Sequence, residues 1–280
     1  MADMTDPNGL VPAARIDHLY FSYAGKPILQ GIHLQIEEGS FTVFLGPNGS
    51  GKTTLLKLIA GILEPTSGRI TVYGEGLNEM PLRKRARQVG YLAQQQQIIF
   101  PFLTEDVVLT GRAGGIRFQP KTEDIDAAVQ AMKDVGISHL LHKPFTELSG
   151  GEQQLVMIAR VVAQNPKMLL LDEPTSHLDL HYQARVLRFI QEWKANGHTV
   201  AAVLHDPNHA LIAADRIVLL KQGRIVGQGG PGEIRVQELE DVYKTRLVPL
   251  SFRNQTVVFS DVDGGFSSDA VHRSEQRSKT

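Results

Sequence analysis

The sequence predicts an α/β protein with a mostly parallel central sheet that helices cover on both faces. Apolar strand-like runs alternate with segments of helical periodicity along most of the 280 residues, as in a parallel sheet joined by crossover helices. A nearly continuous apolar run at residues 41–45 passes directly into the glycine-rich segment GPNGSGKT and then into a helical pattern. A mainly helical stretch over about residues 95–153 interrupts the alternation, so we expect a helical insert.

Five strands and one helix are expected in the first third of the chain. The first two strands alternate apolar and polar side chains, as half-buried strands do. The third is apolar throughout, which suits a strand buried on both faces. Between the third and fourth strands, Leu56, Ile59, Ala60 and Leu63 follow the spacing of a helix. The expected strands are residues 16–21, 32–36, 41–45, 70–73 and 89–92.

The rest of the chain continues the alternation of helices and strands. Helical periodicity covers residues 122–141, a segment that begins near Gly151, and a segment around Ile190. Two short apolar runs are expected to be buried strands, and a polar residue follows each of them directly. The expected strands are residues 168–171 and 199–204, and a hairpin is expected over residues 216–226.

The domain boundaries follow from changes in composition. Residues 1–14 are polar and predict a flexible lead, and residues 15–234 form one domain with the insert at about 95–153. Residues 235–263 are a C-terminal extension. The segment 264–280 is rich in serine, glycine and charge, which predicts disorder because it cannot bury enough apolar surface.

Composition excludes several classes of protein. The chain has no cysteine, which rules out disulfides, a thiolate zinc site and a cysteine nucleophile. Its net charge is −1, and its one dense basic cluster, residues 83–87, is better explained as a solvated helix face, so nucleic acid is not an expected partner. No stretch approaches the ~20 apolar residues of a membrane span. Any work at a membrane is therefore expected to go through partner proteins.

The glycine-rich segment has the spacing of a phosphate-binding P-loop and lies between an expected strand and an expected helix. Its glycines let backbone N–H groups surround phosphate oxygens at the positive end of the helix. Lys52 supplies a positive charge for the β- and γ-phosphates, and the hydroxyl of Thr53 is suited to bind Mg²⁺. A chance glycine-rich turn explains this spacing and context poorly. The expected nucleotide-binding residues are Gly46, Pro47, Asn48, Gly49, Ser50, Gly51, Lys52, Thr53 and Thr54.

Two adjacent carboxylates follow the expected strand at 168–171. The carboxyl edge of a parallel sheet is where ligands of open α/β proteins bind. Two adjacent acids cannot perform the same task, so Asp172 is expected to hold Mg²⁺ and Glu173 to orient and polarise an attacking water. An acidic pair alone is a weak signal, and the P-loop upstream makes it strong.

A second anion-binding turn opens the helix that begins near Gly151. Small residues at a helix N-terminus form a nest for an anion, and Ser149, Gly150 and Gly151 have this character. One nucleotide needs only one such nest, which suggests a phosphate that belongs to another copy of the chain. The same residues also predict a capping box between Ser149 and Glu152, which is compatible with that role.

In this order and combination the motifs resemble those of the ABC transporter ATPases, in which LSGGE, here residues 148–152, is the signature sequence. The resemblance covers about residues 16–234. It implies a P-loop NTPase fold of the ABC ATPase type, with an antiparallel β subdomain beside the mostly parallel core sheet and a helical insert. It also implies ATP hydrolysis with ATP and Mg²⁺ bound.

The resemblance assigns four residues that are weak signals alone. Gln94, in YLAQ, matches the Q-loop, where it would touch Mg²⁺, although the family more often has proline where Ala93 stands. Asp179 belongs to the D-loop, His205 matches the switch histidine, and Tyr23 lies where the family places an aromatic ring that stacks on adenine.

The scheme that the resemblance implies is a head-to-tail homodimer with two ATP molecules between the chains. Each ATP would lie on the P-loop of one chain and under residues 149–151 of the other. Glu173 would activate water, and His205 would contact the γ-phosphate and help position that water. The implied partners are two transmembrane permease subunits, at the cytoplasmic face of the cell membrane, and an extracytoplasmic substrate-binding protein.

The cargo and the alternatives depend on finer similarities. Residues 103–112, 145–160 and 173–180 resemble the subfamily that imports iron–siderophores, haem and cobalamin, and molybdate importers share much of this pattern. One alternative is a soluble ABC ATPase, such as an iron–sulfur assembly component. Another is a nucleotide-binding module without turnover, against which Glu173 and His205 argue.

Overall fold

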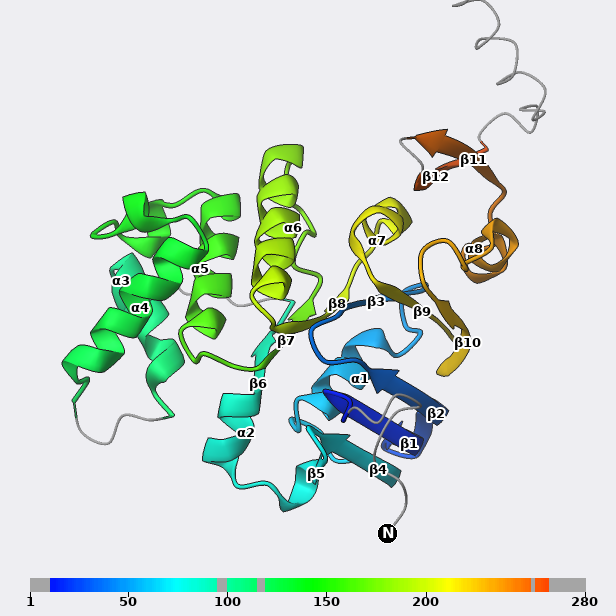
Figure 1. Ribbon diagram of the computed structural model, residues 1–280, viewed down its shortest axis with the longest axis horizontal. Coiled ribbons are helices and arrows are strands. Elements are labelled where there is room, and N and C mark those ends of the chain that lie inside the picture. The colour runs from blue at the N-terminus through cyan, green and yellow to red at the C-terminus, as the bar shows by residue number, and fades with distance from the viewer. Residues whose placement is uncertain (1–10, 95–99, 115–118, 253–254, 262–280) are drawn as a thin grey trace, which may run out of the picture.

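The centre of the protein is a six-stranded sheet in the computed structural model, which describes residues 11–94, 100–114, 119–252 and 255–261. Its strands are β3 (Phe41–Leu45), β6 (Val89–Leu92), β7 (Met168–Asp172), β8 (Thr199–Val203), β9 (Arg216–Lys221) and β10 (Arg224–Gly229). They lie in the order β10-β9-β3-β8-β7-β6, and all neighbours run parallel except the hairpin β9–β10 (Figure 1). The predicted α/β fold with a mostly parallel sheet is therefore confirmed.

A second, antiparallel sheet lies beside the central one. Its strands are β1 (Ala14–Tyr23), β2 (Lys26–Ile36), β4 (Ser67–Val72) and β5 (Glu75–Gly76), in the order β2-β1-β4-β5. Helix α1 (Lys52–Ile59) shares a hydrophobic cluster with both sheets, to which Leu56 of α1, Phe44 of β3 and Ile16 of β1 belong. The two sheets and α1 therefore share one core.

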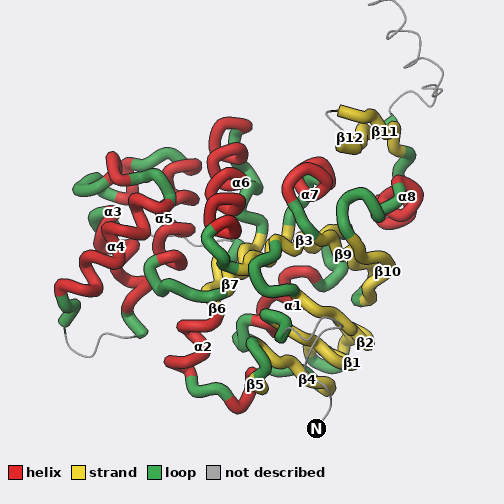
Figure 2. The backbone as a smooth tube through the Cα atoms, in the orientation of Figure 1, coloured by secondary structure: helices red, strands yellow, loops and turns green. Residues whose placement is uncertain are grey.

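The remaining helices surround the central sheet, and α3 to α5 form a group at one end of it (Figure 2). β3, β7 and β8 are buried along their whole length, because the molecule covers both faces of the sheet there. Among the described residues, no helix combines the length and the apolar character that a membrane span requires. The helices are α2 (Leu82–Gln88), α3 (Thr104–Leu109), α4 (Thr122–Asp134), α5 (Gly150–Val162), α6 (Leu180–Ala195), α7 (Pro207–Ala213) and α8 (Val236–Tyr243).

Two helices end earlier than their apolar periodicity predicts. α1 ends at Ile59, and α4 ends at Asp134 rather than at residue 141. Each is followed, two residues later, by a glycine in the left-handed conformation: Gly61 has φ 67° and Gly136 has φ 75°. Such glycines commonly terminate helices because they close the last turn. The apolar residues beyond each glycine belong to the following loop or 3₁₀ turn.

The C-terminal extension folds onto the rest of the protein. It contains α8 and a hairpin of two antiparallel strands, β11 (Leu247–Phe252) and β12 (Gln255–Ser260). Leu239, Val242 and Val258 are buried in the larger hydrophobic cluster of the central sheet. The expected disordered segment 264–280 and most of the expected lead at 1–14 lie outside the described residues, and Ala14 already belongs to β1.

Candidate active site

A cleft of about 510 Å³ opens at the carboxyl edge of the central sheet. The P-loop connects β3 with α1 there, and residues that follow β6, β7 and β8 meet it. Parallel strands place the residues after their carboxyl ends at one edge, which is the usual binding edge of such sheets. The cleft is lined by Ile28, Asn48, Gly49, Gly51, Lys52, Thr53, Thr54, Gln94, Glu173, His177 and His205.

Lys52 lies inside the P-loop with its side chain turned back onto the loop backbone. It is buried, and its Nζ donates to the carbonyl oxygens of Gly46, at 2.7 Å, and of Pro47, at 3.0 Å. Burial lowers the pKa of Lys52, while the carboxylates of Glu173 and Asp172 act in the opposite direction. The P-loop thus holds the ammonium group of Lys52 next to backbone that can approach a phosphate closely.

Asp172 connects the P-loop to two strands. It ends β7, is almost fully buried, and accepts a hydrogen bond from Thr53 Oγ1 at Oδ1, at 2.9 Å. Its other oxygen, Oδ2, accepts from the hydroxyl of Tyr91 on β6, at 3.2 Å. Burial raises the pKa of Asp172, and the two hydroxyl donors act against that rise. Asp172 and Thr53 therefore bring two oxygen ligands together beside the cleft.

Glu173 is held by three side chains that come from different segments. Nε2 of His205 lies 2.7 Å from Oε1, Gln94 Nε2 donates to Oε2 at 2.6 Å, and Ser176 Oγ donates to Oε2 at 3.1 Å. The backbone of Glu173 has φ 55°, which is uncommon for a residue with a side chain. Strained backbone of this kind gathers at functional sites. The three residues predicted to be catalytic, Glu173, His205 and Gln94, are thus in direct contact.

The signature residues lie apart from this cleft. Ser149 caps α5, and the capping box is present: Ser149 Oγ accepts from the amide of Glu152 at 3.3 Å, and Glu152 Oε2 accepts from the amide of Ser149 at 2.8 Å. The amide of Ser149 lowers the pKa of Glu152. None of residues 149–152 lines the cleft of the same chain. Asp179 also lies outside it and caps α6 by accepting from the amide of Tyr182 at 2.9 Å.

Tyr23 is not among the residues that line the cleft. It ends β1, the residue is 45% exposed, and its ring packs edge-on against Phe21 with 4.7 Å between ring centroids. Tyr23 is therefore partly open to solvent. Its predicted contact with adenine stays a prediction.

Pro47 and Ser50 belong to the P-loop, and the Ser50 hydroxyl is buried without a hydrogen-bond partner among the described residues.

Three side chains that the sequence analysis did not select hold the selected ones in place. Tyr91 binds Asp172, Ser176 binds Glu173, and the hydroxyl of Tyr182 lies 3.3 Å from Ser149 Oγ. A methyl group on Gly151 would collide with the ring of Tyr182, so this ring packs directly against the signature turn. Ser176 belongs to the D-loop segment and Tyr91 to YLAQ, so both lie inside recognised motifs. No sequence signal marks Tyr182.

Comparison with known proteins extends these observations. A family model described as ABC transporter matches residues 29–176. The chain is 38% identical over 236 residues to a hemin import ATP-binding protein, HmuV, of Rhodopseudomonas palustris, covering 81% of this chain and 86% of that protein. It is 36% identical over 245 residues to the ferric enterobactin transport ATP-binding protein FepC of Escherichia coli, covering 85% and 89%.

Solved structures of ABC transporters and their ATP-binding cassettes also resemble this chain. A transporter described as metal-chelate type, in an inward-facing conformation, superposes with a TM-score of 0.77 at 30% identity, over 88% of this chain and 96% of that one. A dimeric ATP-binding cassette in a post-hydrolysis state, bound to ADP and phosphate, superposes with a TM-score of 0.69 at 28% identity, over 78% and 98%.

Proposed function

Because this chain belongs to the ABC transporter ATP-binding family, we propose that it hydrolyses ATP to power the import of an iron chelate or haem through partner membrane subunits. The observation that carries the hydrolytic part is the contact of Glu173 with His205 and Gln94 beside the P-loop cleft. These are the groups that a water-activating site needs next to a bound triphosphate.

The roles of the residues follow from their positions. Lys52 and the P-loop backbone bind the β- and γ-phosphates, and Glu173 accepts a proton from the attacking water. His205 lines the cleft with 44% of its side chain exposed, and in the proposed mechanism it donates to the γ-phosphate. Tyr23 offers its exposed face to the adenine ring.

We assign Mg²⁺ to the hydroxyl of Thr53 and the carboxylate of Asp172, with the amide oxygen of Gln94 as a further ligand. Hard oxygen donors of this kind suit Mg²⁺, which usually takes one or two carboxylates together with substrate phosphates. Thr53 Oγ1 and Asp172 Oδ1 lie 2.9 Å apart, so both can face one ion. When bound, Mg²⁺ would neutralise the developing charge on the phosphates.

The position of the signature turn supports a head-to-tail dimer. Ser149 to Gly151 begin α5 on a surface separate from the P-loop cleft, so one chain cannot apply both nests to one nucleotide. In the proposed dimer, the turn of one chain covers the γ-phosphate bound by the other. Loss of that phosphate removes the contact, and the two chains separate. Dimeric cassettes among the structural neighbours support this arrangement.

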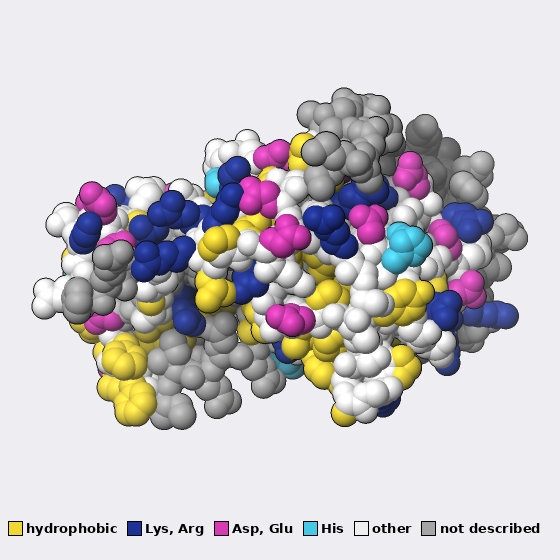
Figure 3. Space-filling view, turned by 90° about the horizontal axis from the view of Figure 1, so that it is seen from below, with side chains coloured by type: hydrophobic (Ala, Val, Ile, Leu, Met, Phe, Trp, Pro, Cys, Tyr) yellow, Lys and Arg dark blue, Asp and Glu magenta, His cyan; other side chains and the backbone are white. Residues whose placement is uncertain are grey.

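The proposed partners are two membrane permease subunits and an extracytoplasmic substrate-binding protein, with this chain at the cytoplasmic face of the membrane. A cleft of about 350 Å³ between α2 and the helical insert is a candidate permease contact. Arg83, Arg87 and Arg112 line it, and Arg112 is paired with Asp124 at 3.1 Å. Figure 3 shows Lys and Arg side chains on the lower side of the molecule, with Asp and Glu side chains among them. An acidic or helix-C-terminal segment of a permease would match this charge.

Uptake in a deletion strain tests the proposal. The strain should lose growth on a ferric siderophore or on haem as sole iron source, and the wild-type gene should restore it. The variant Glu173→Gln should not restore growth, although it is expressed at the same level. A defect confined to molybdate uptake would overturn the cargo, and full restoration by Glu173→Gln would overturn the hydrolytic role. A defect confined to iron–sulfur enzymes would favour the soluble alternative.

A further inference from the structure

The short helix α7 begins two residues after His205 and is tied to the C-terminal hairpin at its first turn. Asn208 Nδ2 donates to the carbonyl oxygen of Val258 at 3.0 Å, and the amide of Val258 donates to Asn208 Oδ1 at 2.8 Å. One side-chain amide thus satisfies both backbone groups of a residue in β12. Val258 is buried in the main core, so this bridge is anchored and not a surface contact.

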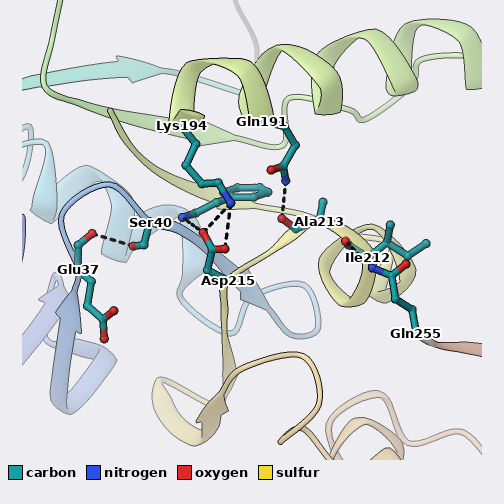
Figure 4. A network of polar contacts seen from close by, with 9 residues as sticks. Glu37, Ser40, Gln191, Lys194, Ile212, Ala213, Asp215 and Gln255 are labelled. Atoms are coloured by element: carbon teal, nitrogen blue, oxygen red, sulfur yellow. Dashed lines mark hydrogen bonds and ion pairs between the residues drawn. The ribbon is translucent and has the colours of Figure 1, made fainter. Parts of the chain in front are cut away.

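The other end of α7 is tied as well. Gln191 of α6 donates to the carbonyl oxygen of Ala213, and Gln255 of β12 donates to that of Ile212 at 3.2 Å (Figure 4). Just beyond α7, Asp215 accepts from Lys194 at 2.9 Å and from the amide of Phe41 at 2.7 Å. A seven-residue helix held at both ends cannot shift without its neighbours.

We propose that β12 acts as a positioning clamp for ATP hydrolysis, in which Asn208 ties α7, and through α7 the adjoining His205, to Val258. The clamp rests on the proposed function. Asn208 is a positioning residue and acts through His205. Displacement of a catalytic group by about 1 Å can cost up to ~10²-fold in rate. A loose α7 would therefore lower turnover through His205 and leave the P-loop and nucleotide binding unchanged.

Steady-state hydrolysis by full-length variants tests the clamp. Asn208→Ala should lower kcat by about tenfold or more and leave KM for ATP unchanged. Asn208→Asp should also lower kcat, because a carboxylate oxygen would replace the amide donor that faces the carbonyl oxygen of Val258. Gln255→Ala, which removes the contact of β12 with the far end of α7, should lower kcat as well. Thr256→Ala, at an exposed residue of β12, is the matched control and should leave kcat and KM unchanged.

The outcomes separate the clamp from the function on which it rests. If wild type hydrolyses ATP, Glu173→Gln does not, and Asn208→Ala behaves like Thr256→Ala, the clamp is wrong and the function stands. A merely structural role predicts lower melting temperatures with unchanged kcat and KM for the folded fraction, and this result would also overturn the clamp. Wild type without ATPase activity would overturn both proposals.

Discussion

Nε2 of His205 lies 2.7 Å from Oε1 of Glu173, and this contact joins two segments that follow neighbouring strands, β8 and β7. Gln94 and Ser176 occupy the other carboxylate oxygen. The proposed base therefore has three neighbours around it, and Oε1, which only His205 contacts among them, is the oxygen with room for a water proton. A bound γ-phosphate offers His205 a stronger acceptor, which gives ATP binding a direct way to free the base.

Replacement of the proposed base tests this view. Glu173→Gln keeps the shape of the side chain and removes its charge, so turnover should fall by about 10²–10⁴-fold. Binding should survive because Lys52 and the P-loop are intact, and the isolated chain should become an ATP-dependent dimer. Size-exclusion chromatography with light scattering, with and without ATP, measures this. Glu123→Gln on the exposed face of α4 is the control. A monomer at saturating ATP, both alone and in the assembled transporter, would rule out the head-to-tail scheme.

The signature turn provides an independent test of the dimer. Ser149→Arg in the Glu173→Gln background should abolish the ATP-dependent dimer, because a bulky cation fills the second nest while each P-loop stays open. Ser138→Arg, at an exposed serine of the same insert, should leave the dimer intact. Nucleotide binding to the monomer, followed by fluorescent ATP, should be the same in both variants. Persistence of the dimer in Ser149→Arg would show that the second anion site lies elsewhere.

The exposed ring of Tyr23 predicts a stacking contribution to ATP affinity. Stacking of a base on an aromatic ring is worth about 1–3 kcal/mol, so Tyr23→Ala should raise KM for ATP by fivefold or more, on the order of that energy. Tyr23→Trp should be tolerated because the indole offers a larger face. Tyr20→Ala, also on β1 and equally exposed, serves as the control. Unchanged KM in Tyr23→Ala would place adenine somewhere else.

The hydroxyl of Tyr91 predicts an effect on metal affinity. It donates to Oδ2 of Asp172, the oxygen that Thr53 does not use, and so fixes the orientation of the carboxylate. Loss of an outer-shell partner typically costs about 10–100-fold in metal affinity or activity. Tyr91→Phe should therefore need about tenfold more Mg²⁺ for half-maximal hydrolysis, at the low end of that range. A titration of MgCl₂ at fixed ATP measures the shift, and Tyr20→Phe should show none.

The environment of His198 predicts a pH dependence of stability. Its ring stacks on Trp193, with 4.0 Å between centroids, and burial lowers the pKa of His198 below its ordinary value of about 6.5. The unfolded chain therefore binds the proton more tightly, so this contribution to stability is present above pH ~6.5 and is lost as the pH falls below it.

The free energy of unfolding should accordingly fall between pH 7.5 and pH 5.5, and His198→Phe, which keeps the stacking, should flatten that fall. Urea unfolding at the two pH values measures it. His139→Phe, at an exposed histidine of the insert, should leave the pH dependence unchanged. An unaltered slope in His198→Phe would show that other groups carry the dependence.

The sequence was sufficient to predict those features that lie on one continuous segment of the chain. The P-loop, the strand before Asp172 and the cap at Ser149 each depend on neighbours within about ten residues, so their local structure follows from their residue types. The contact between Tyr91 and Asp172 is different, because it depends on the pairing of β6 with β7, which sets Tyr91 opposite Leu170. Such a register is decided by tertiary packing and leaves no mark in either segment alone.

The C-terminal extension shows the same limit of prediction from sequence. Leu239, Val242 and Val258 are buried, yet their segments are short and offer little periodicity for a prediction. Asn208 likewise looks like an ordinary residue of the first turn of a helix, and its role becomes visible only when β12 lies beside it.

The backbone at Glu173 has a consequence for how this protein can change. A left-handed conformation costs a residue with a side chain about 1–2 kcal/mol, whereas glycine adopts it freely and asparagine readily. Glutamate at position 173 thus lowers stability and supplies the proposed catalytic base. Such trade-offs between stability and activity are common in proteins. Laboratory evolution for heat resistance alone would drift toward glycine or asparagine at position 173. Selection for growth on scarce iron would hold the glutamate, so position 173 is one at which the two lineages would come to differ.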